Sequence, residues 1–90
     1  MADMIVEYRV MPEDGEVEYS DLETSVKSTV EGHADSVKVL EVREDPVGFG
    51  LKAVRIKFQM DENLGTDELE EKLSGLSQVG EVNVTLMDRL

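Results

Sequence analysis

The sequence predicts an α+β fold in which four antiparallel strands form one sheet and two helices cover one of its faces. Two observations carry this prediction. Four segments alternate apolar and polar residues, as half-buried strands do, and two others repeat leucine or valine at the spacing of one helix face. Their order is strand, helix, strand, strand, helix, strand, which is the βαββαβ arrangement of a ferredoxin-like sandwich.

The first half of the chain supplies one strand and one helix. Alternation over residues 4–11 predicts the strand, and Pro12 ends it because proline cannot donate to a sheet ladder. Ser20 and Glu23 have the spacing of a helix capping box, so the helix is expected to begin there. Valines and a leucine then recur at four-residue intervals, and Gly32 is the expected stop.

The second half supplies three strands and a helix. A strand is predicted over residues 37–43, a loop follows it, and residues 52–60 show the clearest alternation in the chain. Thr66 is expected to cap the second helix. Its buried stripe is Leu69, Leu73 and Leu76, and the last strand is expected to place Val82, Val84 and Leu86 on one face.

The connections determine how these elements are arranged. Right-handed crossovers place both helices on the same face of the sheet. The first and third strands are then central, and the second and fourth lie at the edges. The other face is largely polar and is expected to be solvated or to face a partner. Its residues are Ile5, Glu7, Arg9, Arg55, Lys57 and Gln59.

Length and charge restrict the classes of function. Ninety residues predict a single domain over residues 1–90. A net charge of −12 argues against binding a phosphate backbone or an anionic membrane. The acidity suits a partner with a basic surface, and solubility or adaptation to salt explains it equally well. The chain has no cysteine, and its N-terminus is acidic rather than signal-like, so a cytoplasmic protein is expected.

Little in the sequence suggests an enzyme. One histidine and no cysteine leave no paired nucleophile and base, so no catalytic residue, metal site or cofactor is expected. RNA recognition by this fold stacks bases on aromatic side chains of the central strands. Tyr8 and Phe58 are the aromatic residues of those strands, and both fall on the inward face. We therefore expect no direct binding of nucleic acid.

One aromatic residue is poorly placed for the core. Phe49 stands between Gly48 and Gly50 in the stretch DPVGFGLKA, whereas core aromatics belong on strands and helices. Two interpretations are open. Phe49 either folds back onto its own sheet or enters a pocket on another protein. The glycines either provide unusual backbone angles or let a partner approach closely, and both can hold.

Several segments together resemble archaeal translation elongation factor 1-beta and the C-terminal exchange domain of its eukaryotic counterpart. These segments are VMPE from Val10, PVGFGLKAV from Pro46, GTDELEEKLSGL from Gly65, and the ending VNVTLMDRL. The resemblance covers essentially the whole chain. It implies a ferredoxin-like sandwich and, as activity, guanine nucleotide exchange on elongation factor 1-alpha, the GTPase that delivers aminoacyl-tRNA.

The resemblance also implies which residues bind this partner. Phe49 corresponds to the family's phenylalanine that enters an apolar pocket on the GTPase. Arg89 corresponds to a lysine of the eukaryotic domain that approaches the magnesium site, and here the basic residue is an arginine with Asp88 beside it. The partner-binding residues are therefore expected to be Gly48, Phe49, Gly50, Asp88, Arg89 and Leu90.

An alternative function stays open beside this one. Ferredoxin-like domains also serve as small-ligand regulatory or dimerisation domains. Such a domain would bury Phe49 in its own assembly. For the exchange factor we expect a protein that is not itself an enzyme and that is a monomer when free.

Overall fold

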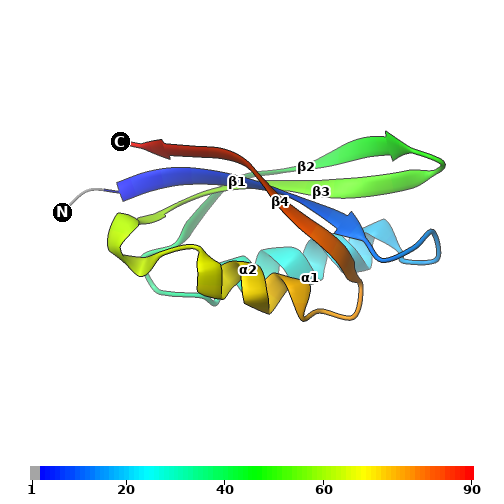
Figure 1. Ribbon diagram of the computed structural model, residues 1–90, viewed down its shortest axis with the longest axis horizontal. Helices are drawn as coiled ribbons and strands as arrows, with labels where there is room; N and C mark the ends of the chain where they lie inside the picture. The colour runs from blue at the N-terminus through cyan, green and yellow to red at the C-terminus, as the bar shows by residue number, and fades with distance from the viewer. Residues whose placement is uncertain (1–2) are drawn as a thin grey trace.

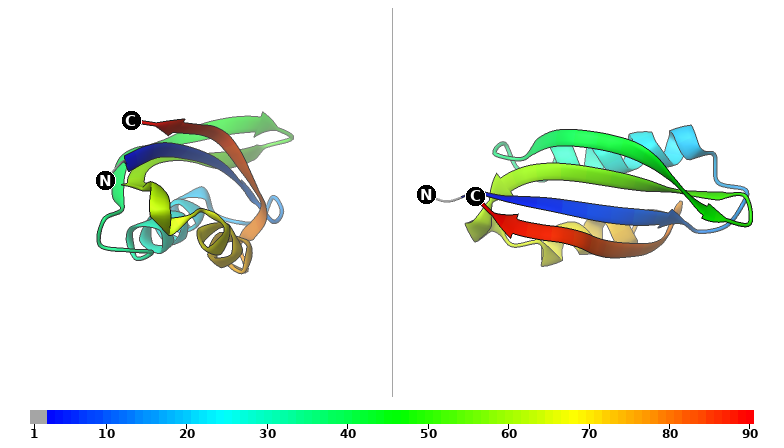
Figure 2. Two further views of the ribbon diagram at one scale, coloured as in Figure 1. Left: turned by 60° about the vertical axis from the view of Figure 1, so that its left-hand side comes forward. Right: turned by 90° about the horizontal axis from the view of Figure 1, so that it is seen from above.

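The predicted sandwich is present in the computed structural model, which describes residues 3–90. The first two residues of the predicted domain lie outside the described ones. The elements follow the order β1 (Asp3–Pro12), α1 (Tyr19–Glu31), β2 (Lys38–Gly48), β3 (Leu51–Asp61), η1 (Glu62–Leu64), α2 (Asp67–Ser74) and β4 (Val79–Arg89). The strands form one antiparallel sheet in the order β2-β3-β1-β4, and both helices cover the same face (Figure 1; Figure 2, left). The fold class and the central places of β1 and β3 are thus confirmed.

The core lies between the helices and the sheet. Alternate side chains of β1 and β3 face the helices and are almost fully excluded from water. The rings of Tyr8 and Phe58 lie at its centre with their centroids 5.4 Å apart, and neither is exposed. The inward orientation predicted for both is confirmed, so neither ring offers a surface on which a base can stack. The helices contribute Leu22, Val26, Val30, Leu69 and Leu73 to this core.

Both predicted helix caps are wrong in their chemistry. Helix α1 begins at Tyr19 with Glu18 in the N-cap position, earlier than the Ser20 box predicts, and no side chain caps it. Thr66 does precede α2, but its hydroxyl accepts no cap hydrogen bond. The Thr66 carbonyl instead accepts hydrogen bonds from the Glu70 N–H, at 2.9 Å, and from the Tyr8 hydroxyl, at 3.4 Å. The start of α2 is therefore tied to the sheet through its backbone.

The last strand departs from simple alternation. The register between β1 and β4 shifts between Glu7 and Tyr8, which leaves Thr85 as an extra residue on β4. Val84 then lies opposite Tyr8, whereas Leu86 lies opposite Glu7 on the other face. The prediction that Val84 and Leu86 share one face is wrong, and both are exposed, at 40% and 38%. Past the bulge, β4 extends beyond α2 to the C-terminus of the chain, which lies near the start of β1 (Figure 1).

Candidate functional site

The hairpin between β2 and β3 is tighter than the sequence predicts. Strand β2 continues past the predicted end at residue 43, through Pro46, to Gly48, which pairs with Leu51. Proline is tolerated here because β2 is an edge strand. The predicted loop thus shrinks to the two residues Phe49 and Gly50, and a bulge between Pro46 and Gly48 precedes it.

The backbone conformation of Phe49 is unfavourable for a phenylalanine. Its φ is +56° and that of Gly50 is +76°, the signs of a type I′ hairpin turn. Asparagine and glycine are the usual residues at such positions, and a left-handed backbone costs another L-residue about 1–2 kcal/mol. The side chain is fully exposed, at 103%, so burial in its own core does not offset this cost. The interpretation in which Phe49 folds back onto the sheet is wrong.

The flanking glycines serve the backbone. Gly48 has a φ of +96°, and a Cβ added to Gly48 or Gly50 would meet no other atom within 4 Å. Lack of space for a side chain therefore does not explain the two glycines. The positive φ angles do, because glycine adopts them without strain. Two ion pairs stiffen the strands below the turn, Arg55 Nε to Asp45 Oδ2 and Lys52 Nζ to Glu44 Oε1, both at 2.8 Å. The phenylalanine is thus presented on a supported hairpin.

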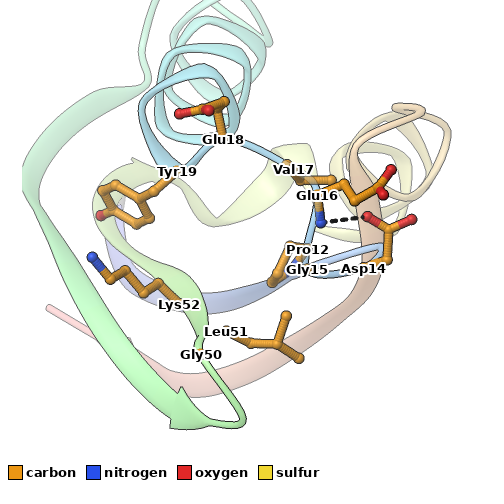
Figure 3. A pocket seen from close by; sticks show the side chains of 10 residues that line it. All are labelled: Pro12, Asp14, Gly15, Glu16, Val17, Glu18, Tyr19, Gly50, Leu51 and Lys52. Carbon is orange, nitrogen blue, oxygen red and sulfur yellow. Dashed lines mark hydrogen bonds between the residues drawn. The ribbon is translucent and has the colours of Figure 1, made fainter.

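A shallow pocket of about 290 Å³ lies beside the turn (Figure 3). The loop between β1 and α1 forms one side of it, and residues 50–52 form the other. Asp14 is not a free group, because its carboxylate accepts a hydrogen bond from the Glu16 N–H at 2.9 Å (Figure 3). The side chains that line it are mostly acidic or apolar, with Tyr19 and Lys52 beside them.

The C-terminal residues are held at the far end of β4. Arg89 lies opposite Met4 on β1, and the Leu90 N–H donates to the Asp3 carbonyl at 3.0 Å. Asp88 and Arg89 are neighbours in sequence but point to opposite faces of the strand. Arg89 pairs instead with Glu62 of η1, its Nε lying 3.1 Å from Oε2, and its side chain remains 81% exposed. Sequence reasoning missed Glu62, since only the fold brings η1 beside the chain end.

The two groups of predicted partner-binding residues lie at opposite ends of the molecule. Strand β3 runs from the hairpin at Leu51 to Asp61 beside the chain ends, and its 11 residues cover roughly 35 Å. The molecule is elongated, measuring 42 × 20 × 18 Å. Figure 1 and the right panel of Figure 2 show the hairpin at one end and the C-terminus at the other. The structure therefore does not join Phe49 and Arg89 in one patch, and only a partner that spans the length of the sheet can contact both.

Two further features restrict what the site can do. Within residues 3–90, no group of three or more potential ligands is arranged to hold a metal ion. No helix in the same range is long and apolar enough to cross a bilayer. What the two ends present is an exposed aromatic ring and an exposed guanidinium, which are groups that suit contact with another macromolecule.

Sequence comparison gives a consistent set of relatives. Residues 5–90 match the family described as the EF-1 guanine nucleotide exchange domain. Elongation factor 1-beta of Methanosphaera stadtmanae is 36% identical over 91 residues, which cover 100% of this chain and 99% of the relative. Elongation factor 1-beta of Thermoplasma volcanium is 33% identical over 84 residues and covers 92% of each chain.

Two solved structures share the fold. The C-terminal domain of the MgtC protein from Mycobacterium tuberculosis superimposes with a TM-score of 0.66 at 16% identity, over 90% of this chain and 84% of that one. The de novo designed protein Foldit4 does so with a TM-score of 0.56 at 24% identity, over 93% and 97%. At these identities the likeness concerns the fold alone.

Proposed function

Because the chain belongs to the family of EF-1 guanine nucleotide exchange domains, and is thus a guanine nucleotide exchange factor of translation elongation, we propose that its partner is elongation factor 1-alpha. On this GTPase it promotes replacement of GDP by GTP, in the cytoplasm, with residues 1–90 acting as one exchange domain. It carries out no bond chemistry of its own. The observation that carries the proposal is the full exposure of Phe49 on a turn whose backbone disfavours it.

Exchange of this kind follows from thermodynamic linkage. A factor that binds the empty GTPase more tightly than the GDP-bound form must weaken GDP binding by the same ratio. Burying a phenylalanine side chain contributes about 1.5–3 kcal/mol, which corresponds to a factor of roughly ten to a hundred in affinity. The Phe49 ring is exposed in the free protein, so all of its apolar area is available for this contact.

Arg89 is proposed to act at the other end of the sheet. A cation brought close to the partner's magnesium site opposes the ion through charge alone and so loosens the nucleotide. Arg89 suits this role because it is exposed and sits on a strand end held by the backbone. Its ion pair with Glu62 must be exchanged for contacts with the partner. The Arg89 side of the pair is open to water, whereas the Glu62 side chain is only 26% exposed. A pair at the surface is worth about 0–1 kcal/mol, and the partner's contacts must offset this loss.

The alternative of a small-ligand regulatory or dimerisation domain is less well supported. That function requires Phe49 to be buried within the protein's own assembly. The pocket near the hairpin is open and is bordered by the acidic loop between β1 and α1. Family membership favours the exchange factor.

Release of a fluorescent GDP from elongation factor 1-alpha tests the proposal. Addition of this chain should accelerate release in the presence of excess GTP, and amounts well below stoichiometric should suffice, because an exchange factor is regenerated. A chain that leaves the release rate unchanged at concentrations above that of the GTPase would contradict the proposal.

Arg89→Ala should lower the maximal exchange rate by about tenfold or more, because the positive charge at the partner's ion site is lost. The concentration required for half-maximal exchange should change by less. Arg89→Lys keeps the charge and should retain most of the rate. Titration of each variant against a fixed amount of labelled GTPase separates the two parameters. If only the half-maximal concentration changes, Arg89 contributes binding and not action at the ion site.

A further inference from the structure

Three arginines form a row across the face of the sheet that the helices leave uncovered. Arg43 on β2 lies directly opposite Arg55 on β3, and Arg55 lies directly opposite Arg9 on β1. Asn83 on β4 completes the row opposite Arg9. Figure 2 (right) shows this face of the sheet, with the helices behind it. Like charges directly opposite each other on neighbouring strands are destabilising, so each arginine needs a compensating anion.

Two members of the row have such anions within the chain. Arg55 pairs with Asp45, at 2.8 Å, and with Glu7, at 3.0 Å. Arg43 pairs with Glu7, at 3.5 Å, and with Glu41, at 3.4 Å. The charges of these two guanidiniums are therefore compensated within the fold.

Glu7 is fully committed to those contacts. Its side chain is buried, with the residue only 6% exposed, and it also accepts a hydrogen bond from the Thr85 hydroxyl at 2.9 Å. Burial raises the pKa of Glu7, but the hydrogen bonds from Thr85 and Arg55 and the charge of Arg43 outweigh it, so the pKa lies below its ordinary value. Glu7 is consequently ionised at neutral pH, and its stabilising contribution is lost only when the pH falls through that lowered pKa.

Arg9 has no such partner. Among residues 3–90, no carboxylate lies within ion-pair distance of it, and its Nε is enclosed without a hydrogen-bond acceptor. The side chain is half-buried beside Arg55 and opposite Asn83. A guanidinium in this position lowers the stability of the fold, because no ion pair within residues 3–90 offsets the cost of its half-buried charge. Such locally unfavourable groups are typical of functional surfaces.

Building on the proposed function, we infer that Arg9 binds a carboxylate of the partner GTPase and that the uncovered sheet face is part of the docking surface. The two terminal Nη groups of Arg9, unlike its Nε, are not enclosed and can bind a carboxylate, and the amide of Asn83 beside them can donate a further hydrogen bond. The occupant is a protein rather than a nucleic acid, because a chain of net charge −12 repels a polyanion but can accommodate a single carboxylate. The uncovered face extends along the sheet from the hairpin of Phe49 to the strand end of Arg89, so a partner that contacts both ends can also reach it.

Arg9→Gln tests this inference against Lys27→Gln, which removes the same charge from the exposed surface of α1. Arg9→Gln should raise the concentration of the chain needed for half-maximal GDP release by about 5- to 20-fold at an unchanged maximal rate. Lys27→Gln should change it by less than about twofold. Equal effects of the two variants would contradict the inference while leaving the exchange function intact. Absence of exchange by the unaltered chain would instead contradict the proposed function.

Two measurements on the free protein add independent evidence. Thermal unfolding of Arg9→Gln should show a midpoint equal to or above that of the unaltered chain, because no internal ion pair is lost. A clear fall in the midpoint would mean that Arg9 serves the fold. Acetate titrated into ¹⁵N-labelled protein should shift the Arg9 Nε–H resonance saturably, and the absence of a shift would contradict the carboxylate site. Binding of single-stranded RNA that Arg9→Gln abolishes would overturn the choice of a protein occupant.

Discussion

Replacing Phe49 by alanine is expected to abolish most of the nucleotide exchange while leaving the fold intact. The loss should be about 10- to 100-fold in the exchange rate at limiting concentration, which corresponds to the burial of one phenylalanine ring in a partner's pocket. The unfolding free energy should change by less than about 0.5 kcal/mol, because the ring contacts no part of the core.

Stopped-flow release of labelled GDP and thermal unfolding measure the two quantities on one preparation. Val47→Ala is a useful comparison because it removes a neighbouring apolar side chain from the hairpin and keeps the ring. If Phe49→Ala retains full exchange activity, Phe49 does not contribute to binding the partner. A large loss of stability would mean that the ring supports the hairpin instead.

Replacing Phe58 by alanine should have the largest effect on stability. The ring is fully buried on a central strand and packs against Tyr8, so its removal leaves a cavity in the middle of the core. Such substitutions cost about 3–5 kcal/mol, a large part of the total stability of a domain of this size. The midpoint of thermal unfolding should fall by more than about 12 °C.

A milder substitution at the same position separates cavity formation from loss of the aromatic pair. Phe58→Leu keeps most of the volume and should cost about 1–2 kcal/mol. Unfolding in urea measures both variants. If Phe58→Ala lost less than 1 kcal/mol, the ring would not be at the centre of the core.

The elements that the sequence predicts well are those with a single buried face. Strands β1 and β3 lie at the centre of the sheet, and buried apolar residues recur at every second position over residues 4–10 and 54–60 because the helices cover one side. This alternation fixed the fold class. The same alternation predicts that Tyr8 and Phe58 face inward.

Where the prediction fails, local signals conflict with the tertiary structure. Pro46 suggests the end of a strand, yet the outer edge of β2 accommodates it. The bulge at Thr85 leaves no mark on an alternating pattern, so the pattern predicts the wrong face for Leu86. Serine is a favoured N-cap residue, which suggests that α1 begins after Ser20, but the helix already begins at Tyr19.

The site was predictable in its parts and not in its arrangement. A phenylalanine between glycines is visible in the sequence as a residue without a place in the core. The distance between Phe49 and Arg89 depends on the direction in which each strand runs, and that is a property of the whole sheet. Glu62 and the unpaired state of Arg9 likewise emerge only from contacts between strands.

Phe49→Asn tests most directly the central claim that Phe49 is retained for a partner at a cost to the free protein. Asparagine is favoured at the first position of a type I′ turn, so it should relieve the strain and raise the unfolding free energy by up to about 1 kcal/mol. The same variant should lose most of its ability to release labelled GDP from elongation factor 1-alpha. Higher stability with lost exchange is the predicted result, and lower stability with full exchange would contradict the account.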